Sequence, residues 1–195
     1  ASAAQAKGKF DIALPLYQRV LTLQPTHTVA LEQREDALSD VLQQASRALA
    51  QGDLATGARL IAQVRGYDAG HVELPDGEAQ LGRAVEQRRQ RADMELRRKR
   101  PEQALANYRA VLAASPDDAA AKQGIERVAT AFAQRAAREA SDFDFTSADE
   151  SLRQARELAP NASAVKEATQ SIARARQSQS RLASALPPKE RARRV

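Results

Sequence analysis

The chain contains an internal repeat that aligns four of its segments on a shared small residue. The anchor residues are Ala13, Gly57, Ala104 and Ala148, so successive segments lie 44, 47 and 44 residues apart. One register is kept along nearly the whole chain. The four segments are therefore expected to adopt the same local structure and to pack against one another.

Large apolar, small and proline residues recur at fixed distances from each anchor. Four residues after the anchors stand Tyr17, Ile61, Tyr108 and Leu152. Twelve residues after, three of the four segments have proline: Pro25, Pro116 and Pro160. Twelve residues before stand Ala1, Ala45, Ala92 and Ala136. Helices approach closely only where neither has a bulky side chain, and proline stops a helix, so each segment is predicted to be an antiparallel helix pair.

Composition supports an all-α fold. The 195 residues include only 8 glycines and 8 prolines, and alanine, leucine, arginine, glutamine and glutamate, which are strong helix formers, dominate the rest. No alternating run of β-branched residues predicts a strand.

Small residues at the helix crossing, a large apolar residue one turn later and a closing proline make the chain resemble the tetratricopeptide (TPR) family. The repeats are longer than the usual TPR length of about 34 residues. The first helix of each pair should be about 15 Å longer as a result. The resemblance implies a right-handed superhelical stack of antiparallel helix pairs, a TPR-like α-solenoid, with a C-terminal capping helix.

The repeat pattern gives a coarse map of helices. We expect one domain over residues 1–183 and a basic tail over 184–195. Expected helices cover 1–7, 11–23, 28–50, 78–99, 101–115, 117–140 and 162–182. Two more are expected: one follows the turn at 52–53 and ends at about 64, and the other follows the turn at 141–145 and ends at 158. Asp11 is expected to cap the second of these, and residues 66–77 should form an irregular connection that carries the three extra residues of the 47-residue spacing.

Positive charge is concentrated in two regions, although the net charge is only +5. Residues 171–195 hold seven basic residues and one acidic residue, a balance of +6. The stretch Arg83–Arg100 holds eight basic and three acidic residues, a balance of +5. These regions indicate either a polyanion or acidic partner, or solvated helix faces. Tyr67 and Tyr108 are not placed in the basic stretch to stack on bases, so nucleic acid is disfavoured.

Residues that carry catalytic or metal chemistry are scarce. The chain has no cysteine, and its two histidines, His27 and His71, are each predicted in or beside a loop without a second imidazole at ligand spacing. Asp142, Asp144, Thr146 and Asp149 resemble a calcium loop only superficially, because the central glycine and closing glutamate are missing. A helix-capping role suits Asp144 or Thr146 better. We expect no enzyme activity, cofactor or metal.

The resemblance also implies where a ligand would bind, because the first helices of TPR repeats line the concave surface. The residues implied there are Leu42, Ser46, Leu49, Ala50, Arg89, Asp93, Leu96, Arg97, Ala133, Ala137, Ala140 and Ser141. Arg89 and Arg97 are expected to be the main ligand contacts.

Several functions remain open at this point. The first is a scaffold or sensor module that binds a protein or peptide. Similar lengthened TPR-like pairs occur in extracytoplasmic portions of bacterial membrane proteins, including some serine/threonine kinases, so this reading favours the periplasm over the cytoplasm. The second is a polyanion-binding module that uses Arg83–Arg100 and the basic tail. The third is a spacer or dimerisation element. No run of about 18 apolar residues predicts a membrane span.

The two ends of the repeat array are expected to differ. Ala1 already occupies the small crossing position, so the first helix is expected to begin upstream of this sequence. The following segment carries apolar residues that 1–7 cannot cover, which favours fraying or a weak homodimer. The last helix should instead present Arg174, Gln177 and Arg181 outward.

Overall fold

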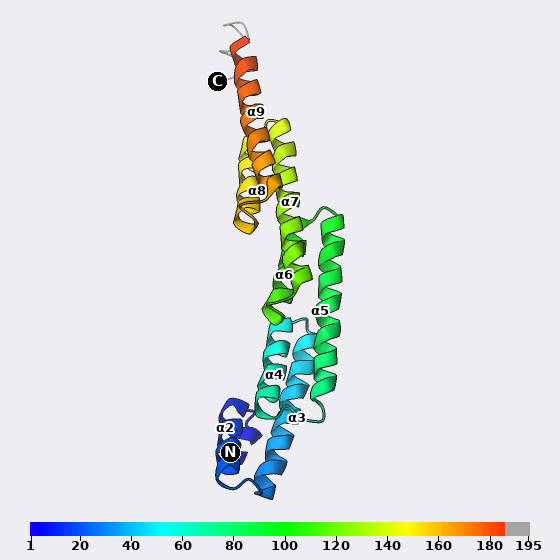
Figure 1. The fold of residues 1–195 in the computed structure, drawn as a ribbon, viewed down its shortest axis with the longest axis vertical. Helices are drawn as coiled ribbons and strands as arrows, with labels where there is room; N and C mark the ends of the chain where they lie inside the picture. The colour runs from blue at the N-terminus through cyan, green and yellow to red at the C-terminus, as the bar shows by residue number, and fades with distance from the viewer. Residues whose placement is uncertain (186–195) are drawn as a thin grey trace. The chain divides into compact units, whose positions relative to one another are not determined.

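The computed structural model describes residues 1–185, and all regular secondary structure in that range is helical (Figure 1). The nine helices of these residues are α1 Ser2–Ala6, α2 Phe10–Leu23, α3 Thr28–Ala50, α4 Leu54–Tyr67, α5 Leu74–Arg97, α6 Pro101–Ala114, α7 Ala119–Ser141, α8 Phe145–Leu158 and α9 Ser163–Ala185. The expected all-α fold is confirmed. Nearly all of the basic tail expected over 184–195 lies outside the described residues.

The helices form two compact units. The first consists of Ala1–Gln90 with Arg109–Asp118, and the second of Arg91–Tyr108 with the chain from Ala119 onward. In the first unit, α2 packs against α1 and α3, and α3 packs against α4. In the second unit, α7 packs against both α8 and α9, which also contact each other, as Figure 1 shows. Helices that follow one another in the sequence therefore pack as pairs.

The helix boundaries follow the repeat register closely. The short helices α2, α4, α6 and α8 have 14 residues each, and each begins three residues before its anchor. The long helices α3, α7 and α9 have 23 residues, and α5 has 24. The repeat pattern in the sequence therefore corresponds to the alternation of short and long helices.

Two sequence-based expectations are wrong in detail. Residues 66–77 are not one irregular connection, because α4 runs to Tyr67 and α5 begins at Leu74. Pro75 therefore lies in the first turn of α5, where its missing N–H breaks no helix hydrogen bond. Asp11 does not cap α2: the N-cap position is Lys9, without a side-chain cap, and Asp11 lies in the first helical turn.

Each short helix is preceded by a turn whose middle residue has a left-handed backbone. These residues are Gly8, Gly52, Lys99 and Phe143, with φ of 67°, 83°, 59° and 61°. In each turn the following amide donates to a carbonyl five residues back, such as Asp53 N to Ala48 O at 2.9 Å. This pattern is the Schellman helix stop, which favours glycine at its left-handed position.

The core lies where paired helices cross at small residues. The anchors Ala13, Ala104 and Ala148 are fully buried. Tyr108 is also fully buried, and its ring lies so close to Gly124 that an added Cβ there would be 2.4 Å away. Gly57 has no room for a side chain either, because its Cβ would lie 2.4 Å from a methyl group of Leu49. Close approach therefore depends on small residues, as the pattern predicted.

The left-handed turns lead to a prediction about stability. Lys99→Gly should stabilise the protein by about 0.5–1 kcal/mol, because glycine adopts this conformation without strain. Phe143→Gly should gain less, because it also removes the contact between the Phe143 and Phe145 rings. Gly52→Ala should have the opposite effect. Urea unfolding followed by circular dichroism measures all three. If both Lys99→Gly and Phe143→Gly destabilised the protein, the conclusion that the backbone is strained at these two residues would be wrong.

The crossing geometry leads to a second prediction. Tyr108→Ala should destabilise the protein by about 3–5 kcal/mol, since it empties a fully buried site. Ala136→Leu should cost about 1–3 kcal/mol, because Ala136 is fully buried at the α7–α8 crossing and has no space for extra atoms. Thermal and chemical unfolding measure both changes. An unchanged melting temperature for Ala136→Leu would show that the repeat register is wrong.

Candidate functional site

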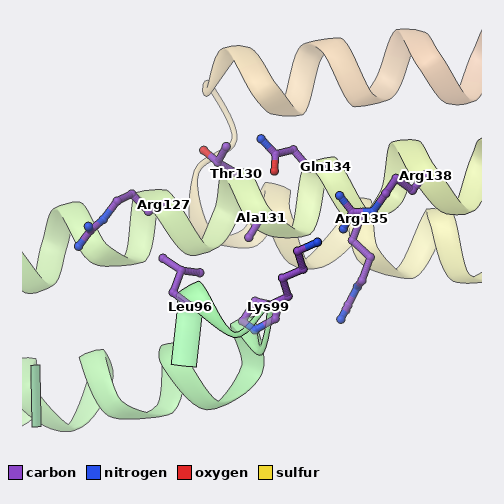
Figure 2. Close-up of a pocket in the computed structure, with 9 residues that line it drawn as sticks. Leu96, Lys99, Arg127, Thr130, Ala131, Gln134, Arg135 and Arg138 are labelled. Atoms are coloured by element: carbon purple, nitrogen blue, oxygen red, sulfur yellow. The ribbon is translucent and has the colours of Figure 1, made fainter. Parts of the chain in front are cut away.

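A basic cleft in the second unit is the best candidate for a binding site. One side is a face of α7, and the other is formed by the end of α5, the turn after it and the start of α6 (Figure 2). The cleft has a volume of about 260 Å³. Its lining residues are Leu96, Lys99, Pro101, Arg127, Thr130, Ala131, Gln134, Arg135 and Arg138.

The helical period of α7 separates its cleft face from its core face. The lining residues on α7 are Arg127, Thr130, Ala131, Gln134, Arg135 and Arg138. This spacing follows the period of an α-helix, so all six lie on one side of α7. Val128 and Phe132, each one position further on, are buried in the core. The apolar residues that hold α7 in the unit thus fix which side its arginines present to the cleft.

Two of the cleft arginines are held by carboxylates. Arg127 donates to Asp93 at 2.8 Å, and Asp93 also accepts a hydrogen bond from the buried Tyr108 hydroxyl. Arg135 donates to Glu102 at 2.6 Å, and its guanidinium lies 4.9 Å from the centre of the Phe132 ring. These contacts fix the guanidinium groups in place and neutralise part of their charge.

The Arg135 pair changes the acidity of its carboxylate. Burial pushes the pKa of Glu102 up, but the hydrogen bond and positive charge of Arg135 push it down, and the net pKa lies below its usual value. Glu102 therefore stays ionised at neutral pH and holds Arg135 at the edge of the cleft.

Two other cations in the cleft have no acidic partner. Lys99 and Arg138 are exposed, and neither side chain makes an ion pair or side-chain hydrogen bond within residues 1–185. Figure 2 shows Lys99 across from the α7 side chains. The cleft therefore carries uncompensated positive charge next to the apolar side chains of Leu96 and Ala131. Such a surface can bind a carboxylate and a nearby apolar group.

The expected ligand contacts in the second unit are divided between the cleft and the interior. Leu96 lines the cleft, and Arg97 is exposed beside it. Asp93 is engaged with Tyr108 and Arg127. Ala133 and Ala140 are buried, Ala137 is half-buried, and Ser141 is exposed.

The expected contacts in the first unit are mostly occupied by the fold. Leu42 and Leu49 are buried, while Ser46 is half-buried and Ala50 exposed. These four residues line two shallow surface pockets, which are also lined by Gln80 and Arg83 of α5. Arg89, expected to be a main ligand contact, pairs with Asp118 at 3.2 Å and with Glu86. Its charge is therefore compensated within the first unit.

Much of the Arg83–Arg100 stretch is likewise engaged within the protein. Arg88 donates to the carbonyl of Gly52 at 2.9 Å. Arg98 and Arg100 lie 3.7 and 3.5 Å from the carboxylate of Glu95. Charge counting in the sequence overstates how much of this stretch is free to bind an anion, because it ignores these pairs.

Sequence reasoning did not single out Arg127, Arg135 and Arg138. Their spacing of eight and three residues places them near one side of a helix, which is a signal that the sequence contains. Their position opposite Lys99 is not visible in the sequence, because it depends on how α7 packs against the preceding pair.

The histidines serve the fold. His27 caps α3, where its Nδ1 accepts from the Ala30 amide at 3.1 Å. The buried His71 accepts from the Glu73 amide through Nδ1 and lies 3.3 Å from Glu35 through Nε2. Asp144 caps α8 by accepting from the Ser147 amide at 3.1 Å, as expected.

Two further searches of the structure gave no candidate site. Within residues 1–185, no group of three or more histidine, aspartate or glutamate side chains is arranged to hold a metal ion. None of the helices in this range combines the length and the apolar character needed to span a membrane.

No protein family matches the chain, and no curated protein is significantly similar to it in sequence.

The lowered carboxylate pKa values predict how stability depends on pH. Besides Glu102, the pKa of Asp53 is lowered by its hydrogen bond from the Thr56 amide, and the pKa of Asp144 by its bonds with Ser147. As the pH falls, these carboxylates are protonated in the unfolded chain at a higher pH than in the folded protein. The free energy of unfolding should therefore be constant near neutrality and fall below about pH 4.

Thermal unfolding between pH 7 and pH 3 measures this effect. Glu102→Gln should lose less stability over that interval than the unchanged protein, since one of the titrating groups is gone. An identical pH dependence in the two proteins would contradict the role of the Arg135–Glu102 pair.

Proposed function

We propose that the chain is a non-catalytic, TPR-like module that binds a protein or peptide, and that the basic cleft takes an acidic segment of that partner. In this proposal the helix pairs form a right-handed superhelical stack with α9 as its cap. The recurring 14-residue short helices and the small residues at each crossing support the family resemblance. The observation that carries the binding site is the pair of uncompensated cations, Lys99 and Arg138, in one cleft.

The size and lining of the cleft favour a peptide side chain as ligand. Its volume of about 260 Å³ is below the range of about 300–1,000 Å³ typical of small-molecule sites. Lys99 and Arg138 suit a carboxylate, while Leu96 and Ala131 suit a neighbouring apolar side chain. Arg127 and Arg135 are already held in position, so they add positive potential without needing to be ordered on binding.

The polyanion alternative has less support. Arg88, Arg89, Arg98 and Arg100 are engaged by protein groups, which removes much of the continuous positive surface that Arg83–Arg100 indicated. Phe132, whose ring lies 4.9 Å from the Arg135 guanidinium, and Tyr108, whose hydroxyl lies 3.2 Å from Arg127, are both buried and are not available to stack on a base.

The two strained turns provide an experiment with a matched control. Lys99→Gly should raise stability and yet weaken binding of an acidic peptide about tenfold, the effect of losing one charge-assisted hydrogen bond. Phe143→Gly makes the corresponding change in another left-handed turn and should leave binding unchanged, because Phe143 lies outside the cleft. Since Lys99→Gly is expected to be more stable than the unchanged protein, weaker binding by this variant cannot be explained by unfolding.

The probes are short fluorescent peptides that share one leucine and differ only in their number of aspartates and lysines. Fluorescence anisotropy should show affinity that rises with the number of aspartates. Arg138→Ala should weaken binding, whereas Arg181→Ala, which removes the same charge from the exposed end of α9, should not. Equal affinity for acidic and basic peptides would exclude this function. Tighter binding to single-stranded DNA, with a steep loss in salt, would favour the polyanion alternative.

A further inference from the structure

The basic cleft holds more positive charge than its internal ion pairs use. Four cations line it: Lys99, Arg127, Arg135 and Arg138. Within residues 1–185, the carboxylates that contact them are Asp93 for Arg127, and Glu102 and Glu139 for Arg135. Among the described residues, none of the side chains that line the cleft is itself acidic. A ligand in the cleft therefore meets two cations, Lys99 and Arg138, that have no carboxylate partner.

The two paired arginines differ in what they can still offer a ligand. Each nitrogen of the Arg135 guanidinium already donates to a protein oxygen. Arg127 uses only Nη2, which donates to Asp93 and to the Tyr108 hydroxyl. Its side chain is 56% exposed, and its Nε and Nη1 make no hydrogen bond within residues 1–185. The cleft therefore offers free N–H groups from Arg127 as well as from the two unpaired cations.

The repeat itself does not require cations at these positions. Two repeats earlier, Asp36 stands on α3 where α7 has Arg127, each 21 residues before its anchor. In the first repeat, Gly8 stands where this helix pair has Lys99, each five residues before its anchor. Helices of the same lengths form with either set of residues. The positive charge of the cleft is thus a property of this helix pair and not of the repeat pattern.

The number of unpaired cations distinguishes a doubly charged ligand group from a carboxylate. A carboxylate carries one negative charge, so it would leave one of the two cations without a partner. A phosphate monoester carries a charge of about −1.5 to −2 at pH 7 and has three acceptor oxygens. It has enough charge for both Lys99 and Arg138, and enough oxygens to accept from Arg127 as well. Charge and hydrogen-bond donors therefore both favour a phosphate monoester.

We propose that the group bound in the cleft is a phosphorylated serine or threonine side chain of the peptide partner. This inference rests on the proposed peptide-binding function of the cleft and specifies its ligand. Lys99 and Arg138 bind the phosphate oxygens from the two sides of the cleft (Figure 2). The neighbouring apolar residue of the peptide packs on Leu96 and Ala131. Arg135 is a positioning residue, because its hydrogen bonds hold α7 to the adjacent helices.

Peptides that differ at one position test the charge of the bound group. The position holds serine, aspartate or phosphoserine beside the same leucine, and fluorescence anisotropy gives each dissociation constant. Phosphoserine should bind about tenfold more tightly than aspartate, because it adds a second charge-assisted contact. Equal affinity for the two would overturn the phosphate assignment and leave the proposed acidic-peptide function in place. If neither peptide bound, the proposed function would be wrong, and the phosphate assignment with it.

The pH dependence of binding identifies the doubly charged form. The second pKa of a phosphate monoester is about 6, so affinity for the phosphoserine peptide should fall about threefold between pH 7.5 and 5.5. Affinity for the aspartate peptide should stay constant, because an aspartate titrates at about pH 4. The two histidines of the chain, His27 and His71, belong to the first unit and do not line the cleft. A constant affinity for phosphoserine, or an equal fall for both peptides, would overturn the assignment.

Two variants test whether Lys99 and Arg138 recognise the phosphate. Lys99→Gln and Arg138→Gln should each reduce the tenfold preference for phosphoserine over aspartate toward equality. Partial unfolding would weaken the binding of both peptides alike, so the ratio of affinities reports recognition alone. Arg181→Gln removes the same charge from the exposed end of α9 and should keep the preference. An unchanged preference in both cleft variants would overturn the assignment.

Competition separates a phosphopeptide from other sources of phosphate. Inorganic phosphate lacks the apolar group, and the phosphodiesters of a single-stranded oligonucleotide carry only one charge each. Each should therefore displace the labelled phosphoserine peptide only at concentrations about tenfold or more above those of the unlabelled peptide. Displacement by either competitor at the same concentration as the unlabelled peptide would overturn the phosphopeptide assignment.

Discussion

The close crossing of two helices at a small residue is the contact on which the rest of the structure depends. Alanine or glycine at the anchor lets the long and short helices of a pair approach, and a large side chain one turn later fills the space beside the crossing. At the anchor Gly57 of α4, a methyl group of Leu49 of α3 is too close for even a Cβ atom. Because burial at this point is complete, the register of each pair is fixed, and the short helices have the same length in all four repeats.

The left-handed turns before the short helices are occupied by different residue types. Gly8 and Gly52 adopt the left-handed position without strain, but Lys99 and Phe143 occupy it in the later repeats. Phe143 gains an edge-on contact with the Phe145 ring at 6.2 Å. Lys99 makes no comparable contact and instead places an ammonium group at the cleft. A strained residue that lines a cleft is a reason to look for function there, and this agrees with the proposed role of Lys99 in binding.

The sequence by itself determined the helices and their core. Anchor spacing, small residues and prolines were enough to place α3 at 28–50 and to align Tyr108, which is fully buried, with the large residues of the other segments. These signals act within one helix pair. Tertiary structure decided which charges are available. Arg89 was expected to contact a ligand but is paired with Asp118, and Arg138 was overlooked but lies unpaired in the cleft. Ion pairing joins side chains about thirty residues apart, and no local pattern encodes that distance.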